Sequence, residues 1–399
     1  MNTRDLPVVR LKPKTDARPI RHGFPWVYAN QIVTNRRTKA ILPGALARLE
    51  DSERAPLGVV TANPNSKIFC RMLDRDPDAV IDKAWLAAKL TRALRHRERL
   101  FDTAFYRLIH AEADGLPGVI IDRFGDTLVI QPNAAWADVL FDDLSAAAAE
   151  VTGVSTIIKN ATGRARKLEG LDENSAIIGG EVTAPVPVTM NGATYMADLT
   201  GGQKTGLFYD QRANHTFAQR LADGARVLDV FSHVGGFALA ALAGGATSAL
   251  AVDGSTAALD LAKQGAEATG VADRFATMKA DAFDALTSLG EQGEVFDVVI
   301  CDPPAFAPTK QSLDAGLRAY ERVARLAAPL VAAGGYLVLC SCSHAADVSR
   351  FQKACNRGIG RGGRQAQLIY TGFAGADHPL LPQLAESGYL KALFYRLDG

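Results

Sequence analysis

The chain has 399 residues, 48% of them hydrophobic and 22% charged, with 44 Lys and Arg against 43 Asp and Glu. This length and composition exclude a mini-protein and a disordered chain, and they allow two or three domains that each bury a core. The net charge of +1 conceals an uneven distribution, because residues 1–110 carry a net +10 and residues 111–399 a net −9. The basic first quarter predicts a module that faces a polyanion.

The cysteine pattern indicates a reducing compartment. Five cysteines form no CxxC pair and are odd in number, so we expect no disulfide framework. Residues 1–14 lack the apolar core of a signal peptide, and no stretch approaches the about 18 apolar residues of a membrane span. We therefore expect a cytoplasmic protein.

Residues 1–76 are expected to form the first domain. Short alternating apolar runs are separated by turn residues at 43–44 and 62–66, which is typical of a small β barrel or sandwich. Basic residues cluster near its start, among them Arg18, Arg21, Arg36 and Arg37, and an aromatic run that contains Trp26 lies between them.

Residues 77–190 are expected to form a small α+β domain. Apolar residues at helical spacing over 81–105 share their segment with four arginines, which predicts an amphipathic, basic helix; a solvated surface helix has the same pattern. A second helix is predicted over 136–151. Strand-like runs lie at 107–112, 118–124, 127–133, 156–160 and 176–180.

Residues 191–399 are expected to form the third domain. From Arg226 onward, apolar strands alternate with helices across short connections, and one of these helices is predicted over 312–335. Strands buried on both faces, each followed by a helix, are typical of a doubly wound parallel sheet. The runs 366–372 and 389–397 predict a terminal antiparallel hairpin, for roughly seven strands in all.

Acidic or nucleophilic residues end five successive strands of this third domain. Ligands bind beyond the carboxyl ends of such strands, so these positions are candidates for a site. A lone Asp at a strand end is often a helix N-cap, but five such positions are much less probable by chance. They are Asp229 before a Gly235-Gly236 pair, Asp253, Asp281, Asp302 before two prolines, and Ser341-Cys342-Ser343.

Four segments together carry a resemblance to a known family. Residues 198–215, 227–241, 299–306 and 334–347 are similar to class I S-adenosylmethionine-dependent methyltransferases, in particular to large-subunit rRNA cytosine-5 methyltransferases of the RlmI type. Residues 11–32 resemble the PUA RNA-binding domain that opens those proteins, and residues 107–131 resemble their central domain. The resemblance implies a β-barrel PUA domain, an α+β central domain and a seven-stranded Rossmann-like methyltransferase domain.

The resemblance also implies roles for individual residues around S-adenosylmethionine. Asp229 and Gly235 would belong to the loop under its methionine moiety, Asp253 would bind the ribose hydroxyls, and Asp281 the adenine amine. Asp302 would lie where the methyl group and the target base meet. An upstream element closing over the methionine end would contain Gln203, Lys204, Asp210, Gln211 and Arg212, although its GGQKTG segment also fits a simple glycine-rich turn.

Cytosine-5 chemistry needs a cysteine nucleophile, because C5 of the ring is a poor nucleophile until a thiolate has added at C6. Alignment with the family places Cys342 at the nucleophile position, and Cys340 fits a buried small hydrophobe better. Asp302 would hydrogen-bond the ring. Many RNA cytosine-5 methyltransferases have a second cysteine just after the fourth strand, and here that position is Ala305.

Other interpretations stay open. The DPPAF segment at 302–306 resembles the (D/N)PP(Y/F) signature of enzymes that methylate an exocyclic base amine and need no thiol. A non-catalytic RNA-binding protein could retain the cofactor fold. Cys340, Cys342 and His344 alternate as metal ligands might, but a structural zinc site normally has four ligands, and we expect no metal.

Large-subunit rRNA, unfolded or protein-free, is the partner that the resemblance implies. Arg18, Arg21, Arg36 and Arg37 would contact phosphates, which makes binding salt-dependent. Trp26 would stack on an unpaired base, although an aromatic residue in so small a barrel also fits its core. The oligomeric state is open, with a homodimer as one option.

Overall fold

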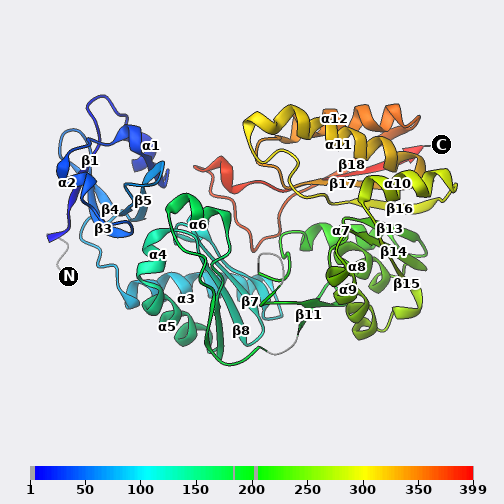
Figure 1. The fold of residues 1–399 in the computed structure, drawn as a ribbon, viewed down its shortest axis with the longest axis horizontal. Helices are drawn as coiled ribbons and strands as arrows, with labels where there is room; N and C mark the ends of the chain where they lie inside the picture. Colours follow the sequence, from blue (N-terminus) through cyan, green and yellow to red (C-terminus); the bar gives the residue numbers. More distant parts are fainter. Residues whose placement is uncertain (1–4, 183–184, 202–204, 399) are drawn as a thin grey trace. The chain divides into compact units, whose positions relative to one another are not determined.

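The computed structural model describes residues 5–182, 185–201 and 205–398, and the chain divides into two compact units. Unit 1 contains residues 1–183, 199–205 and 377–387, and unit 2 contains residues 184–198, 206–376 and 388–399 (Figure 1). Two short segments of the C-terminal half therefore belong by their contacts to unit 1. The expected domain boundaries at residues 76 and 190 stay a prediction.

Unit 1 begins with the expected small β barrel. Its five strands are arranged in the order β1-β3-β4-β5-β2, and a bridge between Leu11 and Ile32 joins residues that follow the two edge strands. Alternating residues such as Val9, Ala47 and Leu49 fill the interior. The elements are β1 (Val8–Arg10), α1 (Arg18–Arg21), β2 (Trp26–Tyr28), α2 (Arg36–Lys39), β3 (Ala45–Glu50), β4 (Pro56–Ala62) and β5 (Ile68–Asp74).

The rest of unit 1 is an α+β arrangement around a sheet of order β10-β9-β8-β7-β6. The predicted basic helix is present as α3, capped by Asp82 and buried along Leu86, Leu90 and Leu94. The helix predicted over 136–151 is instead two helices, because the backbone leaves the helical region at Leu140. The elements are α3 (Lys83–Leu100), β6 (Phe105–His110), β7 (Val119–Phe124), β8 (Thr127–Pro132), α4 (Ala135–Val139), α5 (Phe141–Thr152), β9 (Thr156–Lys159), α6 (Arg164–Glu169) and β10 (Ala176–Gly179).

Unit 2 contains the predicted seven-stranded sheet, in the order β15-β14-β13-β16-β17-β19-β18. Neighbouring strands from β15 to β17 are parallel, and β19 is antiparallel to both β17 and β18, which confirms the doubly wound sheet with a terminal antiparallel pair. The strands are β13 (Arg226–Val230), β14 (Ser248–Asp253), β15 (Phe275–Lys279), β16 (Phe296–Cys301), β17 (Val331–Ser341), β18 (Gln365–Gly372) and β19 (Lys391–Asp398), with a separate hairpin of β11 (Val186–Met190) and β12 (Ala193–Ala197).

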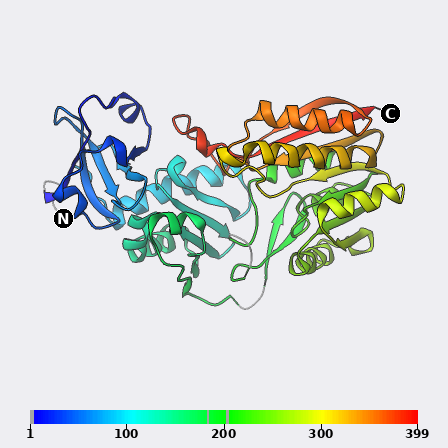
Figure 2. The ribbon, with the colours of Figure 1, turned by 45° about the horizontal axis from the view of Figure 1, so that its top comes forward.

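Helices cover this sheet, and α11 and α12 lie side by side over it (Figure 2). The helix predicted over 312–335 is shorter in the structure, because Pro329 lies in a 3-10 turn and Val331 already pairs with β16. The helices are α7 (Arg212–Leu221), α8 (Gly236–Ala243), α9 (Thr256–Thr269), α10 (Ala282–Glu291), α11 (Leu313–Ala327) and α12 (Val348–Arg361). Within the described ranges, no helix combines the length and apolarity needed to cross a bilayer.

Candidate active site at the edge of the sheet

The five candidate strand ends form a row along one edge of the sheet in unit 2. Because β13 to β17 are parallel, their carboxyl ends lie on the same edge. The strand order places the candidates in the sequence Asp281, Asp253, Asp229, Asp302 and Cys342 across that edge. With about 4.8 Å between neighbouring strands, the row extends over about 19 Å, enough for an extended nucleoside ligand and a second ring beside it.

The loop after β13 has the backbone of a ligand-binding turn. Phe231, His233 and Gly235 have positive φ angles of 64°, 50° and 79°. A non-glycine residue in this region is uncommon, and such strain collects at ligand sites. At Gly235 a Cβ atom would also meet Leu239 at 3.2 Å, so both conformation and space require the glycine.

Asp229 is a buried carboxyl group with an unused acceptor. The residue is 1% exposed, and its Oδ2 accepts a hydrogen bond from the Ala238 N–H at 2.9 Å. Among the described residues, nothing hydrogen-bonds its Oδ1 or the buried Oγ of Ser232. Buried polar atoms are rarely left unpaired, so these two atoms fit a ligand that brings its own polar groups. The predicted role of Asp229 beneath the methionine end of S-adenosylmethionine stays a prediction.

Burial raises the pKa of Asp229 to about 8. The carboxylates of Asp302 and Asp253 act in the same direction, and the Ala238 N–H opposes them. A carboxyl group with this pKa is largely protonated in the cofactor-free protein at neutral pH, and a nearby cation would favour its ionised form.

Asp253 and Asp281 both organise backbone at their strand ends. Asp253 accepts from the His233 N–H at 2.9 Å and from the Ser255 N–H at 2.8 Å, so it also fixes the loop after β13. Asp281 is exposed and caps α10, accepting from the Phe283 N–H at 2.8 Å. The N-cap role weighed for a lone Asp is therefore present at Asp281, and a carboxylate oxygen keeps further lone pairs for a ligand. Their predicted ribose and adenine roles stay predictions.

The upstream element is partly described. Gln203 and Lys204 lie outside the described residues. Asp210 is 6% exposed and its Oδ2 accepts from the Tyr389 hydroxyl at 2.6 Å. Gln211 is 4% exposed and its Oε1 accepts from Asn214 Nδ2 at 2.6 Å. The guanidinium of Arg212, at the start of α7, lies 5.4 Å from the Tyr209 ring centroid. Asp210, Gln211 and Arg212 thus lie in unit 2, where the carboxylate of Asp210 is joined to Tyr389 of the C-terminal segment.

Cys342 differs from the other four cysteines in exposure. It is partly exposed at the end of β17, whereas the others are buried. Burial raises the pKa of Cys340 and Cys301, which keeps both thiols protonated. Cys301, which comes directly before Asp302 in the chain, belongs to the core between the sheet and its helices. The geometry leaves Cys342 as the accessible thiol.

A buried hydroxyl cluster fixes the turn around Cys342. The Tyr320 hydroxyl, from α11, lies 2.7 Å from Ser343 Oγ and accepts from Ser341 Oγ at 2.9 Å. Ser343 Oγ also accepts from the Ala307 N–H at 2.9 Å, which ties the loop after β16 to the end of β17. Sequence analysis missed Tyr320, because it lies 21 residues from Ser341 on a helix whose pattern indicates only packing.

Lys391 is a second residue that sequence analysis missed. It is 5% exposed, and its Nζ donates to the carbonyl oxygens of Ser343 and Tyr389, both at 2.7 Å. A signal was present: Lys391 shares a face of β19 with Leu393 and Tyr395, which the apolar pattern marks as buried. A lysine on that face is a buried charge next to the Cys342 turn.

The predicted RNA-contacting residues lie on and beside the barrel of unit 1. Arg36 and Arg37 are exposed on α2, and no carboxylate of the described residues pairs with them. Arg18 pairs with Asp16, and Arg21 with Asp51. Trp26 donates its indole N–H to Glu112 at 2.8 Å, which occupies one of its edges. Of these four arginines, Arg36 and Arg37 are therefore the most available to bind phosphates.

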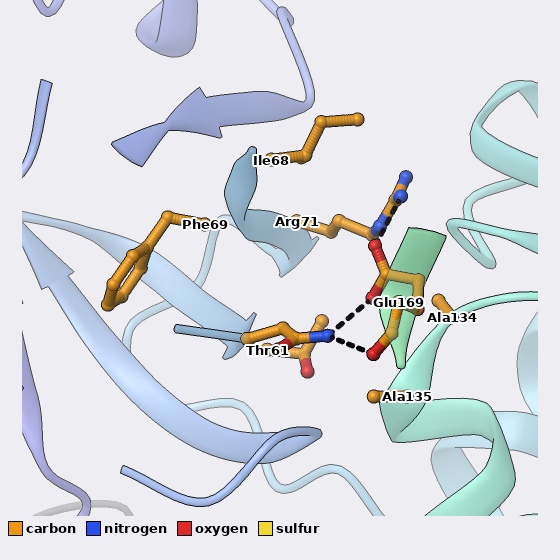
Figure 3. Close-up of a pocket in the computed structure, with 8 residues that line it drawn as sticks. Thr61, Ile68, Phe69, Arg71, Ala134, Ala135 and Glu169 are labelled. Atoms are coloured by element: carbon orange, nitrogen blue, oxygen red, sulfur yellow. Dashed lines mark hydrogen bonds and ion pairs between the residues drawn. The ribbon is translucent and has the colours of Figure 1, made fainter. Parts of the chain in front are cut away.

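A small depression is lined by residues of unit 1 alone (Figure 3). Its polar groups already satisfy one another: Asn63 Nδ2 donates to Glu169 Oε2 at 2.9 Å, and Arg71 pairs with Glu169 Oε1 at 3.1 Å. Arg71 also pairs with Glu112 at 2.8 Å. This polar cluster joins the barrel to the central sheet within unit 1. In the described part of the chain, no group of three metal-ligating side chains is placed to hold an ion.

Comparison with known proteins identifies the family. A family model described as S-adenosylmethionine-dependent methyltransferase matches residues 152–395, and a model of a PUA-like domain matches residues 9–75. Ribosomal RNA large subunit methyltransferase I of Cronobacter sakazakii is 34% identical over 374 residues, covering 92% of this chain and 93% of that protein. Its counterpart from Yersinia pseudotuberculosis is 34% identical over 378 residues, covering 94% and 95%.

Solved structures share the fold. A Streptococcus mutans protein described as a SAM-dependent methyltransferase matches with a TM-score of 0.81 at 20% identity, over 98% of this chain and 100% of that one. A methyltransferase complexed with SAH matches with a TM-score of 0.81 at 21% identity, over 98% and 99%. The chain therefore belongs to the family of ribosomal RNA large subunit methyltransferase I, which joins a PUA-like domain to a class I methyltransferase domain and takes S-adenosylmethionine as its cofactor.

Proposed function

We propose that this protein transfers a methyl group from S-adenosylmethionine to C5 of a cytosine in large-subunit (23S) rRNA, through a covalent adduct between Cys342 and the base. The observation that carries the proposal is the placement of Cys342. It is the one partly exposed cysteine of five, and it ends the strand next to β16, after which Asp302 follows. The names of the relatives support large-subunit rRNA as the substrate. The cytoplasm is the compartment that fits this substrate.

The chemistry follows from the ring. The Cys342 thiolate adds to C6 of the cytosine and pushes electron density to C5, which makes C5 nucleophilic. The cofactor supplies an electrophilic methyl group, which C5 takes. A base then removes the C5 proton, the C5–C6 double bond re-forms, and the thiolate leaves. Asp302, which follows the neighbouring strand, would accept a hydrogen bond from the exocyclic amine as a carboxylate or donate one to N3 when protonated, and the bond to N3 would help the ring accept the thiolate.

The cofactor would be held by the row of residues on the other side of Asp302. Asp229 Oδ1 and Ser232 Oγ, both without described partners, would bind its methionine end. Asp253 and Asp281 would take the ribose and adenine. Ala305 lies where many RNA cytosine-5 methyltransferases have a second cysteine, so the base that removes the C5 proton would be water or a nearby carboxylate.

The RNA must present an unpaired ring to this edge. Flipping a base out of its stack costs a few kcal/mol, least where the strand is already single, which favours unfolded or protein-free rRNA. Exposed arginines of the PUA-like barrel, Arg36 and Arg37 foremost, would supply phosphate contacts that carry no sequence information.

Substituting the two neighbouring cysteines tests the adduct. We expect Cys342→Ala to abolish tritium transfer from labelled cofactor to 23S rRNA of a deletion strain, while Cys340→Ala retains most of it. Nucleoside mass spectrometry of the product should show 5-methylcytidine. Wild-type transfer by Cys342→Ala, or a product methylated on an exocyclic amine, would contradict the proposal.

A further inference from the structure

Lys391 is anchored against both sides of the Cys342 turn. In the antiparallel pair of β17 and β19, Lys391 lies opposite Ser341, the residue before Cys342. Its Nζ donates at 2.7 Å to the carbonyl oxygen of Ser343, the residue after Cys342, and at 2.7 Å to that of Tyr389. Register and hydrogen bonds together hold the ammonium group beside the thiol-bearing turn.

This ammonium group has no carboxylate to balance it. Within the described residues, no Asp or Glu oxygen lies within ion-pair distance of Lys391 Nζ, and two carbonyl oxygens are its hydrogen-bond acceptors. An ammonium group has three N–H donors, so one remains. Removing an unpaired ammonium ion from water costs several kcal/mol, so a site that keeps one buried favours an anion next to it.

Two groups that become anions on losing a proton lie near enough to Lys391 to raise its pKa, namely Cys342 and Asp347. Asp347 is mostly exposed to water, caps α12 through the Arg350 N–H at 2.8 Å and pairs with the Arg350 guanidinium. Water therefore screens the charge of Asp347, and the Arg350 guanidinium already pairs with it. Cys342 is the remaining candidate for the anion.

We propose that Lys391 is the positioning residue that keeps Cys342 ionised as a thiolate before the base arrives. The inference rests on the proposed role of Cys342 as nucleophile. The thiol proton goes to water, and the sulfur anion pairs with the third N–H of the ammonium group. No other bond forms or breaks in this step.

The surrounding titratable groups are consistent with this pairing. Burial raises the pKa of Tyr320, so its hydroxyl faces the turn as a neutral group. Burial raises the pKa of Cys340, and Asp302 at the end of the neighbouring strand acts in the same direction, so Cys340 stays neutral and does not compete for the ammonium group. Burial also lowers the pKa of Lys391 to about 8, and the charge of Cys342 opposes that shift, so the lysine stays mostly protonated at neutral pH.

Alkylation of the cofactor-free, RNA-free protein tests the pairing, because Cys342 is the accessible thiol. The rate of iodoacetamide labelling at Cys342 is followed against pH by peptide mass spectrometry on the full chain. For the wild type we expect the midpoint of the rate curve below about pH 8.5, the ordinary value for a cysteine. Lys391→Met should move the midpoint up by at least about one pH unit and slow labelling at neutral pH about tenfold.

Two controls separate charge from structure. Lys353→Met removes an exposed lysine from α12 and should leave the curve unchanged. Lys391→Arg retains the positive charge and should restore most of the wild-type rate. Cofactor binding reports whether each variant is folded. A Lys391→Met curve that coincides with the wild type overturns the proposal, and so does a wild-type midpoint at or above about pH 8.5, even if Lys391→Met fails to fold.

The readout needs neither RNA nor methyl transfer. A lowered midpoint that depends on Lys391, together with a product other than 5-methylcytidine, would contradict the proposed function and leave the lysine–thiolate pair standing. A midpoint that does not depend on Lys391, together with 5-methylcytidine as the product, would contradict the lysine–thiolate pair and leave the proposed function standing.

Discussion

Asp229 is a carboxyl group in a place that water does not reach. It is held by the Ala238 N–H, and the neighbouring carboxylates of Asp302 and Asp253 disfavour its ionised form. The same arrangement leaves Oδ1 open to a donor from a ligand. Burial of Asp229 therefore both raises the cost of ionising it and leaves an unpaired acceptor, which is where we propose that the cofactor binds.

The pH dependence of stability should report this cost. Because the pKa of Asp229 in the fold, about 8, lies above its ordinary value of 3.8, its proton stabilises the folded chain. That contribution is complete at low pH and is lost as the pH rises from about 4 through about 8. Urea unfolding of the cofactor-free protein should therefore show stability falling across this window, and Asp229→Asn should flatten the fall. Parallel curves for the two proteins would contradict the assignment.

At the scale of elements, α11 fixes the turn that carries Cys342, the proposed nucleophile, although the helix contributes no proposed reacting group. Its Tyr320 hydroxyl joins Ser341 and Ser343 on either side of Cys342, and Ser343 in turn holds the loop after β16. A thiol that must reach C6 of a ring needs its turn fixed to a fraction of an ångström. In the proposed mechanism, α11 therefore positions the Cys342 thiol through Ser341 and Ser343.

Tyr320→Phe should separate this positioning from cofactor binding. Loss of the hydroxyl removes two hydrogen bonds and should cost about 1–3 kcal/mol of unfolding free energy. We also expect kcat to fall about tenfold or more with an unchanged cofactor Kd. Tyr395→Phe is the matched control, because its hydroxyl bonds Asn356 away from the strand end. A similar kcat in both variants would show that the cluster only stabilises the fold.

Element boundaries show what the apolar pattern can and cannot determine. The pattern predicts α3 and the parallel strands, because one buried face fixes their period. It extends the helix before β17 to residue 335, since apolar residues continue without interruption, whereas the backbone changes at Pro329. The pattern also misses β2. Its aromatic residues Trp26 and Tyr28 lie among basic residues in the sequence, so this run is interpreted as one that contacts RNA.

At the scale of the whole molecule, charge is divided along the chain. Residues 1–110 carry a net +10, and the remaining chain, with a net −9, carries the strand-end aspartates that we propose hold the cofactor. The near-neutral total is therefore compatible with a nucleic acid substrate. Binding to phosphate should depend on the barrel and on salt.

Arg36→Ala combined with Arg37→Ala tests this division. The double variant should weaken rRNA binding and lower the slope of log affinity against log salt by about one to two, at an unchanged cofactor Kd. Arg318→Ala with Lys353→Ala removes two exposed charges from α11 and α12 and should have a much smaller effect. Equal losses in the two double variants, measured by filter binding across salt concentrations, would place the RNA contacts elsewhere.

The sequence predicts which residues end the strands, but not their order in space. In the chain the candidates run from Asp229 to Cys342, whereas across the sheet Asp281 comes first, because β14 and β15 extend on the opposite side of β13 from β16. Tyr320 and Lys391 become visible only when helices and strands distant in sequence pack together. Such contacts depend on tertiary structure, which a local pattern does not encode.

The central claim is that Cys342 bonds to cytosine during catalysis. Incubation with the cofactor and an rRNA fragment containing 5-fluorocytidine tests it most directly, because fluorine at C5 cannot leave as a proton does and the adduct is trapped. Peptide mass spectrometry should find the methylated base attached to Cys342 and to no other cysteine. Methyl transfer to the unmodified RNA with no adduct on the fluorinated RNA would contradict the account.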